Sequence, residues 1–221
     1  MSLPRLAPPF GPRLFTAKTR VPLPPPHFLS RPRLLESLRA RISVHKLVVV
    51  LAPSGFGKTT MVAELARTLA GEAAWLTLDS SDQDLSVFVH YLIAAVAHGR
   101  PGFGADLLAW LAATPTPGDQ IEDCAAILVD ALEQLEATPL VLFLDDFQEV
   151  SGNASITRLL DRVLRYLPPP IHLVLSARRE PALTTTRLLA EQQISGLGAD
   201  DLRFTVSETE HWLALRADPA T

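Results

Sequence analysis

Cysteine is nearly absent from this chain: Cys124 stands alone among 221 residues. A single cysteine excludes an internal disulfide framework and fits a reducing compartment, and we expect Cys124 to be a small core residue. The six histidines show no metal-ligand spacing with Cys124 or with one another, so no zinc site is expected. The sequence also lacks a nucleophile elbow and a dinucleotide-binding glycine motif.

Long apolar runs are absent as well. The longest apolar helical stretch, residues 85–97, is too short to span a bilayer and contains His90. The N-terminus has no continuous apolar core of the signal-peptide type. A hydrophobic content of 48% with 20% charged residues is typical of a globular domain. We therefore expect a cytoplasmic protein of one large or two small domains, without a membrane partner.

Acidic residues are almost missing from the start of the chain. Residues 1–46 hold nine Lys and Arg residues but only one acid, Glu36, which gives a net charge of +8. The rest of the chain holds eleven Lys and Arg residues and 23 acids, which gives a net charge of −12. A basic arm can indicate nucleic-acid binding. The same segment has nine prolines by Pro32 and few aromatics at base-stacking spacing. An extended arm that packs on the acidic body, or helps to enclose ligand phosphates, is the interpretation we favour.

A phosphate-binding loop is the most informative motif that is present. Residues 47–51 are apolar and predict a buried strand. Residues 52–59, APSGFGKT, match G-x-x-x-x-G-K-[ST] except that Ala52 replaces the first glycine. Glycines let backbone N–H groups wrap a triphosphate, and the N-terminus of the next helix adds a positive dipole end. The alternative is an ordinary glycine-rich turn between a strand and a helix.

The loop assigns chemistry to particular side chains. Lys58 supplies the point charge for the β- and γ-phosphates, and the Thr59 hydroxyl is a predicted Mg²⁺ ligand. The predicted nucleotide contacts in the loop are Ser54, Gly55, Phe56, Gly57, Lys58, Thr59 and Thr60.

Apolar periodicity predicts alternating strands and helices along the chain. We expect strands at 47–51, 73–78, 140–144, 171–175 and 194–197, and helices at 32–42, 59–70, 85–98, 107–113, 120–136, 155–167, 182–192 and from 207 onward. Such alternation, with uniformly apolar strands, indicates an α/β fold. The expected architecture is a three-layer P-loop NTPase with a mainly parallel five-stranded sheet, helices on both faces and an extended Pro-rich N-terminal arm.

Two acids follow the predicted strand at 140–144. Ligands of such sheets bind at the carboxyl ends of the strands, where the phosphate loop also lies. Asp145 there would hold Mg²⁺, and Asp146 would orient or deprotonate an attacking water. Alone, two aspartates after a strand more often belong to a solvated turn. Here the pair follows the phosphate-binding loop in the chain, and this order favours the magnesium site.

An arginine pair follows the predicted strand at 171–175. Arg178 is the candidate that would reach the γ-phosphate and stabilise developing charge. Arg179 remains a second candidate, and a surface ion pair between Arg178 and Glu180 is the alternative.

Together these segments resemble a known family, the nucleotide-binding domain of MalT-like, LuxR-type large transcriptional regulators. Those regulators belong to the STAND class of signal-transduction NTPases within the AAA+-related P-loop proteins. The segments that carry the resemblance are FTAKTRVPLPPPHFLSRPRLLESL, KLVVVLAPSGFGKTT, AAWLTLD, FVHYLIAA, PLVLFLDDFQEV, LPPPIHLVLSARREP and ADDLRFT, from about Phe15 to the end.

The resemblance implies ATP or ADP as the ligand, with Mg²⁺. It implies that residues around Phe28 and Arg31 enclose the adenine, and that Lys58 with Thr59, and Asp145 with Asp146, are the two Walker pairs. It implies that Arg178 belongs to a sensor motif. The expected domains are an arm and short helix at 1–45 that contribute to the site, an NTPase core at 46–200, and the start of a following helical segment at 201–221.

The function implied is a regulatory ATPase switch, whose ATP form self-associates and whose slow hydrolysis resets it. Contact with DNA would be made only through a domain outside this chain. A P-loop phosphotransferase with a small acceptor is the alternative, although residues 99–118, the candidate lid, hold only one arginine, Arg100. A third hypothesis, a DNA-binding module, is supported only by the basic arm.

Overall fold

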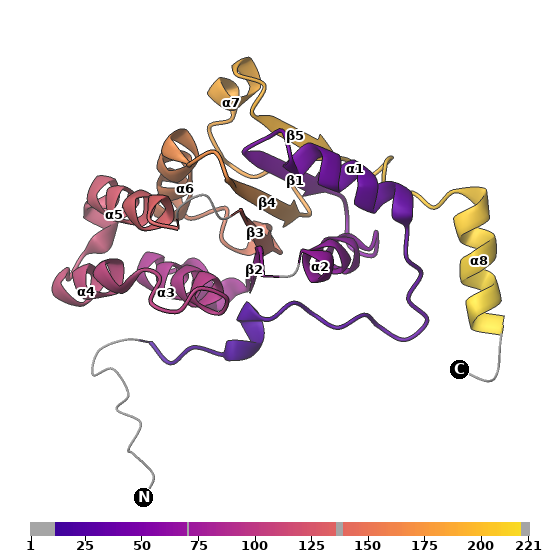
Figure 1. Cartoon of the computed structure of the whole chain (residues 1–221), viewed down its shortest axis with the longest axis horizontal. Coiled ribbons are helices and arrows are strands. Elements are labelled where there is room, and N and C mark those ends of the chain that lie inside the picture. Colours follow the sequence, from indigo (N-terminus) through magenta and orange to yellow (C-terminus); the bar gives the residue numbers. More distant parts are fainter. Residues whose placement is uncertain (1–11, 70, 136–138, 218–221) are drawn as a thin grey trace, which may run out of the picture.

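A computed structural model describes residues 12–69, 71–135 and 139–217 (Figure 1). Its five strands form one sheet, in the order β2-β3-β4-β1-β5, and every neighbouring pair is parallel. The strands are β1 Leu47–Leu51, β2 Ala73–Thr77, β3 Leu140–Asp145, β4 Ile171–Ala177 and β5 Ile194–Leu197. The predicted α/β fold with a five-stranded parallel sheet is confirmed.

Helices cover both faces of this sheet (Figure 1). One face carries α1 Pro32–Ile42 and α2 Lys58–Thr68, which share a core cluster with Val48 and Val50. The other face carries α3 Leu85–Ala97, α5 Ile121–Glu133 and α6 Ala154–Tyr166, with α4 Ala105–Ala113 packed against α5. Because successive strand residues point to opposite faces, uniformly apolar strands such as β1 supply both cores.

The last part of the chain departs from the predicted helices. Residues 182–192 were expected to be helical, but α7 spans only Thr186–Ala190. Pro181 and the segment after it stay irregular, because Asp161 of α6 accepts hydrogen bonds from the backbone N and Oγ1 of Thr184, both at 2.8 Å. Beyond β5, α8 Val206–Ala217 lies apart from the helices on the sheet (Figure 1). No helix among the described residues is long and apolar enough to cross a membrane.

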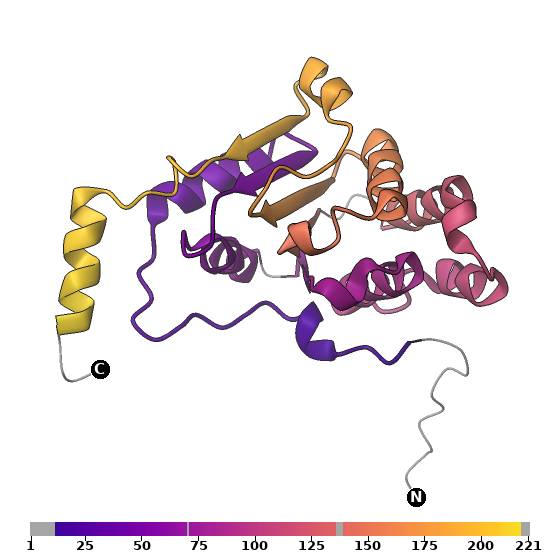
Figure 2. The same ribbon diagram turned by 180° about the vertical axis from the view of Figure 1, so that it is seen from behind.

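The N-terminal arm is attached to the body by an ion cluster around the buried Asp82. The 3-10 helix η1, Thr16–Thr19, lies beside α3, and from there the arm runs past α2 and enters α1 (Figure 2). Lys18 Nζ lies 2.8 Å from Asp79 and 2.6 Å from Asp82, and 4.7 Å from the centre of the Tyr91 ring. Burial alone would lower the pKa of Lys18, but the hydrogen bonds to both acids outweigh it and raise that pKa. The basic arm therefore packs on acidic residues that follow β2.

We predict that Lys18→Ala lowers the free energy of unfolding by about 3 kcal/mol, because it leaves the fully buried Asp82 carboxylate without its partner. The bond to Lys18 also lowers the pKa of Asp79 to about 2. A depressed carboxyl pKa stabilises the fold above the unfolded value of about 3.9, and this contribution is lost as the pH falls toward 2. Urea unfolding at pH 6 and pH 2.5 measures both effects.

The difference between wild type and Lys18→Ala should be largest at pH 6 and smaller at pH 2.5. Arg20→Ala, an exposed residue of the same arm, is the matched control and should change little. Equal stability of the Lys18 variant and wild type at pH 6 would contradict the assignment of Lys18 as the anchor.

Candidate functional site

The turn between β1 and α2 lies at the carboxyl edge of the sheet. Gly55 and Gly57 have φ of 85° and 76°, a left-handed conformation that residues with a side chain rarely adopt. Gly57 is the N-cap of α2, and no side chain caps the free N–H groups of the first turn. No acidic side chain lies in that turn either. The helix N-terminus is therefore free to receive an anion.

Lys58 folds back across this turn. Its Nζ donates a hydrogen bond to the Pro53 carbonyl oxygen at 3.1 Å, and its side chain is buried. Burial lowers the pKa of Lys58, and the nearby carboxylates of Asp146 and Asp145 act in the opposite direction. A buried ammonium with one carbonyl partner has two further N–H donors for a ligand.

Asp145, the last residue of β3, is buried beside Thr59. Thr59 Oγ1 donates to Asp145 Oδ1 at 3.1 Å, and Ser176 Oγ from β4 donates to the same oxygen. Asp145 Oδ2 has no hydrogen-bond partner among the described residues. Burial raises the pKa of the Asp145 carboxyl, although the bonds from Ser176 and Thr59 act against it.

This donor set fits a magnesium ion. A cation near Oδ2 would satisfy the unpartnered oxygen and offset the cost of burying a carboxylate. Mg²⁺ in proteins is commonly held by one or two carboxylates together with ligand phosphates rather than by an all-protein cage. The described residues contain no group of three or more His, Cys, Asp or Glu side chains suited to a metal. Asp145 and Thr59 are the residues that would hold the ion.

Asp146 and Arg178 lie near each other at the ends of β3 and β4. Asp146 adopts a left-handed backbone conformation, φ 56°, and Arg178 Nη2 lies 3.8 Å from its Oδ1. Gln148, in the 3-10 helix η4 Phe147–Glu149, connects them. Its Nε2 donates to Asp146 Oδ1 at 2.8 Å, and its Oε1 accepts from the Arg178 backbone N–H at 3.0 Å. Among the described residues Arg178 forms no ion pair with Glu180, the alternative that the sequence left open.

A cavity of about 230 Å³ adjoins the turn on the arm side. Gly55, Gly57 and Thr60 line it from the turn and α2, and Phe28 lines it from the arm. Three more aromatic rings complete its wall, those of Phe56, Phe204 and Trp212. Aromatic faces of this kind stack on planar ligand rings such as nucleobases.

Arg31 connects three segments around that cavity. Its Nη1 donates to the Leu202 carbonyl oxygen at 2.7 Å, its Nη2 donates to the Phe56 carbonyl oxygen at 3.4 Å, and its guanidinium lies 5.0 Å from the Phe204 ring centre. Burial lowers the pKa of Arg31. A Cβ at Gly57 would come within 3.2 Å of Arg31 Nη2, so the glycine permits this close approach. Arg31 thus lines the cavity while its hydrogen bonds go to protein carbonyl groups.

The structure brings the predicted residues to one edge of the sheet. The turn, Asp145, Asp146 and Arg178 meet there, while Phe28 and Arg31 lie on the other side of the turn, at the cavity. Ser54 is exposed at the tip of the turn. Sequence reasoning missed Gln148, Phe204 and Trp212. The apolar pattern around Trp212 predicts a core residue, but this side chain is half-buried and lines the cavity.

Comparison with known proteins assigns the family. A sequence profile described as the AAA ATPase domain matches residues 28–175, more than half of the chain. The chain belongs to the AAA ATPase domain family. Membership implies nucleotide binding and suggests ATPase activity.

This AAA ATPase domain is also a distant relative of the HTH-type transcriptional regulator MalT of Cronobacter sakazakii, with 28% identity over 205 residues, or 92% of the chain. It spans 22% of the length of that MalT.

Solved structures agree on the fold of this AAA ATPase domain. The Walker-type ATPase PABY2304 of Pyrococcus abyssi gives a TM-score of 0.50 at 12% identity, over 85% of this chain and 57% of that one. A chain of the Drosophila ORC structure bound to GC-rich DNA and Cdc6 gives 0.50 at 14% identity, over 80% and 60%. At such low identities the likeness concerns the fold alone. The predicted fold and the predicted P-loop ATPase relationship are confirmed, and the likeness to MalT is a distant one.

Proposed function

We propose that this AAA ATPase domain is a regulatory switch that binds ATP with Mg²⁺ and hydrolyses it slowly. The observation that carries the proposal is the meeting of Thr59 and Asp145. Their side chains are joined at 3.1 Å, directly beside Lys58, with one buried carboxylate oxygen unpartnered. A triphosphate is bound and polarised by three parts: a phosphate loop, a cation site and an ammonium group. All three meet at this place.

Each part has a proposed role. The backbone N–H groups of residues 54–60 and the Lys58 ammonium hold the β- and γ-phosphates. Thr59 and Asp145 hold Mg²⁺, which neutralises phosphate charge when bound. Asp146 orients or deprotonates the attacking water, and Arg178 stabilises charge on the γ-phosphate. The aromatic cavity at Phe28 receives the adenine.

The proposed switch extends to the C-terminal helix α8. We assign residues 1–45 to the arm and α1, 46–200 to the NTPase core and 201–221 to a following helical segment. Arg33 of α1 donates to the Asp201 and Arg203 carbonyl oxygens and pairs with Glu208 at 2.8 Å. Since Arg31 joins the same segment to the turn, a ligand that moves the turn would also move α8.

Gln148 has a positioning role in this proposal, and Gln148→Ala is expected to lower kcat for ATP several-fold with unchanged ATP affinity. Loss of a hydrogen bond costs about 0.5–1.5 kcal/mol, which corresponds to roughly 2- to 10-fold. Phosphate release and calorimetric titration measure the two quantities. Gln83→Ala is the matched control, because Gln83 bonds the Glu149 carbonyl oxygen of η4 but not Asp146. An equal loss in both variants would show that the placement of η4 matters rather than the Gln148 amide.

Assaying the fate of the γ-phosphate tests the proposed function. We expect slow release of inorganic phosphate from Mg²⁺-ATP, below the typical enzyme turnover of about 10 s⁻¹, with no phosphorylated product when small alcohols or sugars are added. Transfer to an acceptor faster than hydrolysis would instead favour the phosphotransferase.

Contact with DNA is proposed to lie outside this domain, so duplex DNA should bind weakly or not at all. Tight binding of duplex DNA, with the steep salt dependence of phosphate contacts, would contradict the proposal that DNA is contacted outside this domain.

A further inference from the structure

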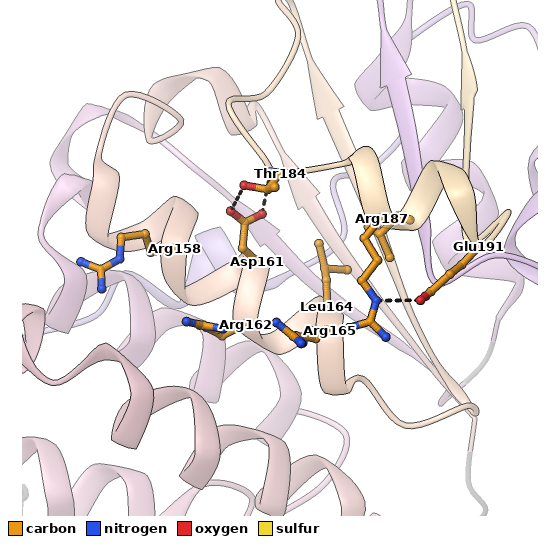
Figure 3. A pocket seen from close by; sticks show the side chains of 9 residues that line it. Arg158, Asp161, Arg162, Leu164, Arg165, Thr184, Arg187 and Glu191 are labelled. Carbon is orange, nitrogen blue, oxygen red and sulfur yellow. Dashed lines mark hydrogen bonds and ion pairs between the residues drawn. The ribbon is translucent and has the colours of Figure 1, made fainter.

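A second cavity, of about 300 Å³, lies between α6 and α7 and is lined by four arginines (Figure 3). Arg158, Arg162 and Arg165 come from α6, and Arg187 comes from α7. In the close-up, Arg162, Arg165 and Arg187 lie in a row along the cavity (Figure 3). None of these residues belongs to the nucleotide site described above.

The concentration of arginine here contrasts with the rest of the domain. Beyond residue 46 the chain carries a net charge of −12, with eleven Lys and Arg residues in all. Four of those eleven line this one cavity, and all four are arginine. Arginine presents a planar fork of donors that matches phosphate and carboxylate oxygens in pairs.

The acids near the cavity are already engaged. Both carboxylate oxygens of Asp161 accept hydrogen bonds from Thr184, which fixes the wall between α6 and α7. Glu191 pairs with Arg187 at 2.6 Å, and Glu122 of α5 pairs with Arg162 at 2.7 Å. Both ion pairs are solvent-exposed, and such pairs contribute little, so an incoming anion can replace them.

Two of the guanidinium groups lack a counter-ion. Arg158 and Arg165 form no ion pair among the described residues. With Arg162 they occupy positions i, i+4 and i+7 of α6, which places three like charges on one helix face. Like charges at this spacing destabilise a helix by a few tenths of a kcal/mol per pair. An anion bound in the cavity would remove that repulsion.

We propose that this cavity binds a compact anion with two or more phosphate groups, an oligophosphate. Several guanidinium forks around about 300 Å³ suit closely spaced phosphates better than one isolated charge. The described lining contains no aromatic side chain, so it offers no stacking surface for a base. The acidic body would repel a long nucleic acid, while the local arginines attract a small anion.

The test is calorimetric titration with tripolyphosphate at fixed ionic strength, since surface attraction is screened by salt. The parent protein carries Lys58→Ala, so that the phosphate loop does not compete. We expect one site in this parent and at least tenfold weaker binding after the further changes Arg165→Ala and Arg187→Ala. Arg203→Ala, an exposed arginine paired with Asp200 elsewhere, is the matched control and should leave the affinity unchanged.

A second titration controls for a folding defect of the Lys58→Ala parent. In it, wild-type protein saturated with ADP is titrated with tripolyphosphate in the same way. Absence of tripolyphosphate binding in both titrations overturns the proposal. So does an affinity unaffected by the Arg165 and Arg187 changes, or an equal loss in the Arg203 control. Tighter binding of a polyglutamate peptide or of duplex DNA than of tripolyphosphate would overturn it as well. None of these outcomes depends on whether the domain hydrolyses ATP.

Discussion

Lys58→Ala is expected to remove Mg²⁺-ATP binding, with an affinity at least about 100-fold below that of the wild type. The Lys58 ammonium is buried at the turn, and Pro53 is its one hydrogen-bond partner among the described residues. Each hydrogen bond to a charged group contributes about 1.5–3 kcal/mol, and about 1.4 kcal/mol changes an affinity tenfold. An ammonium that contacts both the β- and γ-phosphates would make two such bonds. Calorimetric titration with Mg²⁺-ATP measures the loss.

Lys46→Ala is the control for this experiment. Lys46 directly precedes β1, at the opposite edge of the sheet from the turn, and its replacement should leave the affinity unchanged. Because a truncated buried side chain can also weaken the fold, thermal unfolding of both variants accompanies the titration. A folded Lys58 variant that binds Mg²⁺-ATP as tightly as the wild type would show that the turn is an ordinary glycine-rich connection.

Asp146→Asn should keep ATP binding and lower the hydrolysis rate by about 100-fold or more, the range of general acid–base contributions. The substitution preserves shape, and asparagine tolerates the left-handed backbone found at this position. The asparagine carbonyl oxygen can still accept the bond from Gln148 and lie beside Arg178. What is lost is the carboxylate that orients or deprotonates water. Phosphate release under single-turnover conditions separates this loss from any change in binding.

Asp130→Asn, on the exposed side of α5, is the matched control and should hydrolyse ATP like the wild type. If Asp146→Asn turned over ATP at the wild-type rate, the base would have to be sought elsewhere. Weaker binding with an unchanged rate would instead assign Asp146 to the ligand site rather than to the reaction.

The sheet could be predicted from the sequence because its strands are short, apolar and bounded by polar or glycine-rich segments. The strand at 47–51 was predicted with the bounds that β1 has, since the glycine-rich turn ends it sharply. The helix at 182–192 was predicted too long, because apolar spacing alone does not reveal that Asp161 holds Thr184 in a non-helical loop. Tertiary contacts overrode local propensity at that place.

The candidate site could be predicted from the sequence where its residues belong to short motifs. Lys58 and Thr59 are adjacent in the loop, and Asp145 follows an apolar strand, so order and spacing point to them. Gln148 could not be found this way, because its two partners meet only when the ends of β3 and β4 are side by side. Trp212 was misjudged for a related reason. Its apolar pattern is typical of a core helix, whereas its actual position depends on how α8 packs at the cavity.

The measurement that tests the switch most directly is the mass of the protein in solution with ATP and with ADP. The Asp146→Asn variant, examined by light scattering, holds the ATP state during the experiment, and the nucleotide that co-purifies with the wild type identifies the resting state. We predict an adenine nucleotide in the purified protein and a larger, self-associated species with Mg²⁺-ATP than with Mg²⁺-ADP. The same mass with both nucleotides, in a protein shown by titration to bind each of them, would contradict the account.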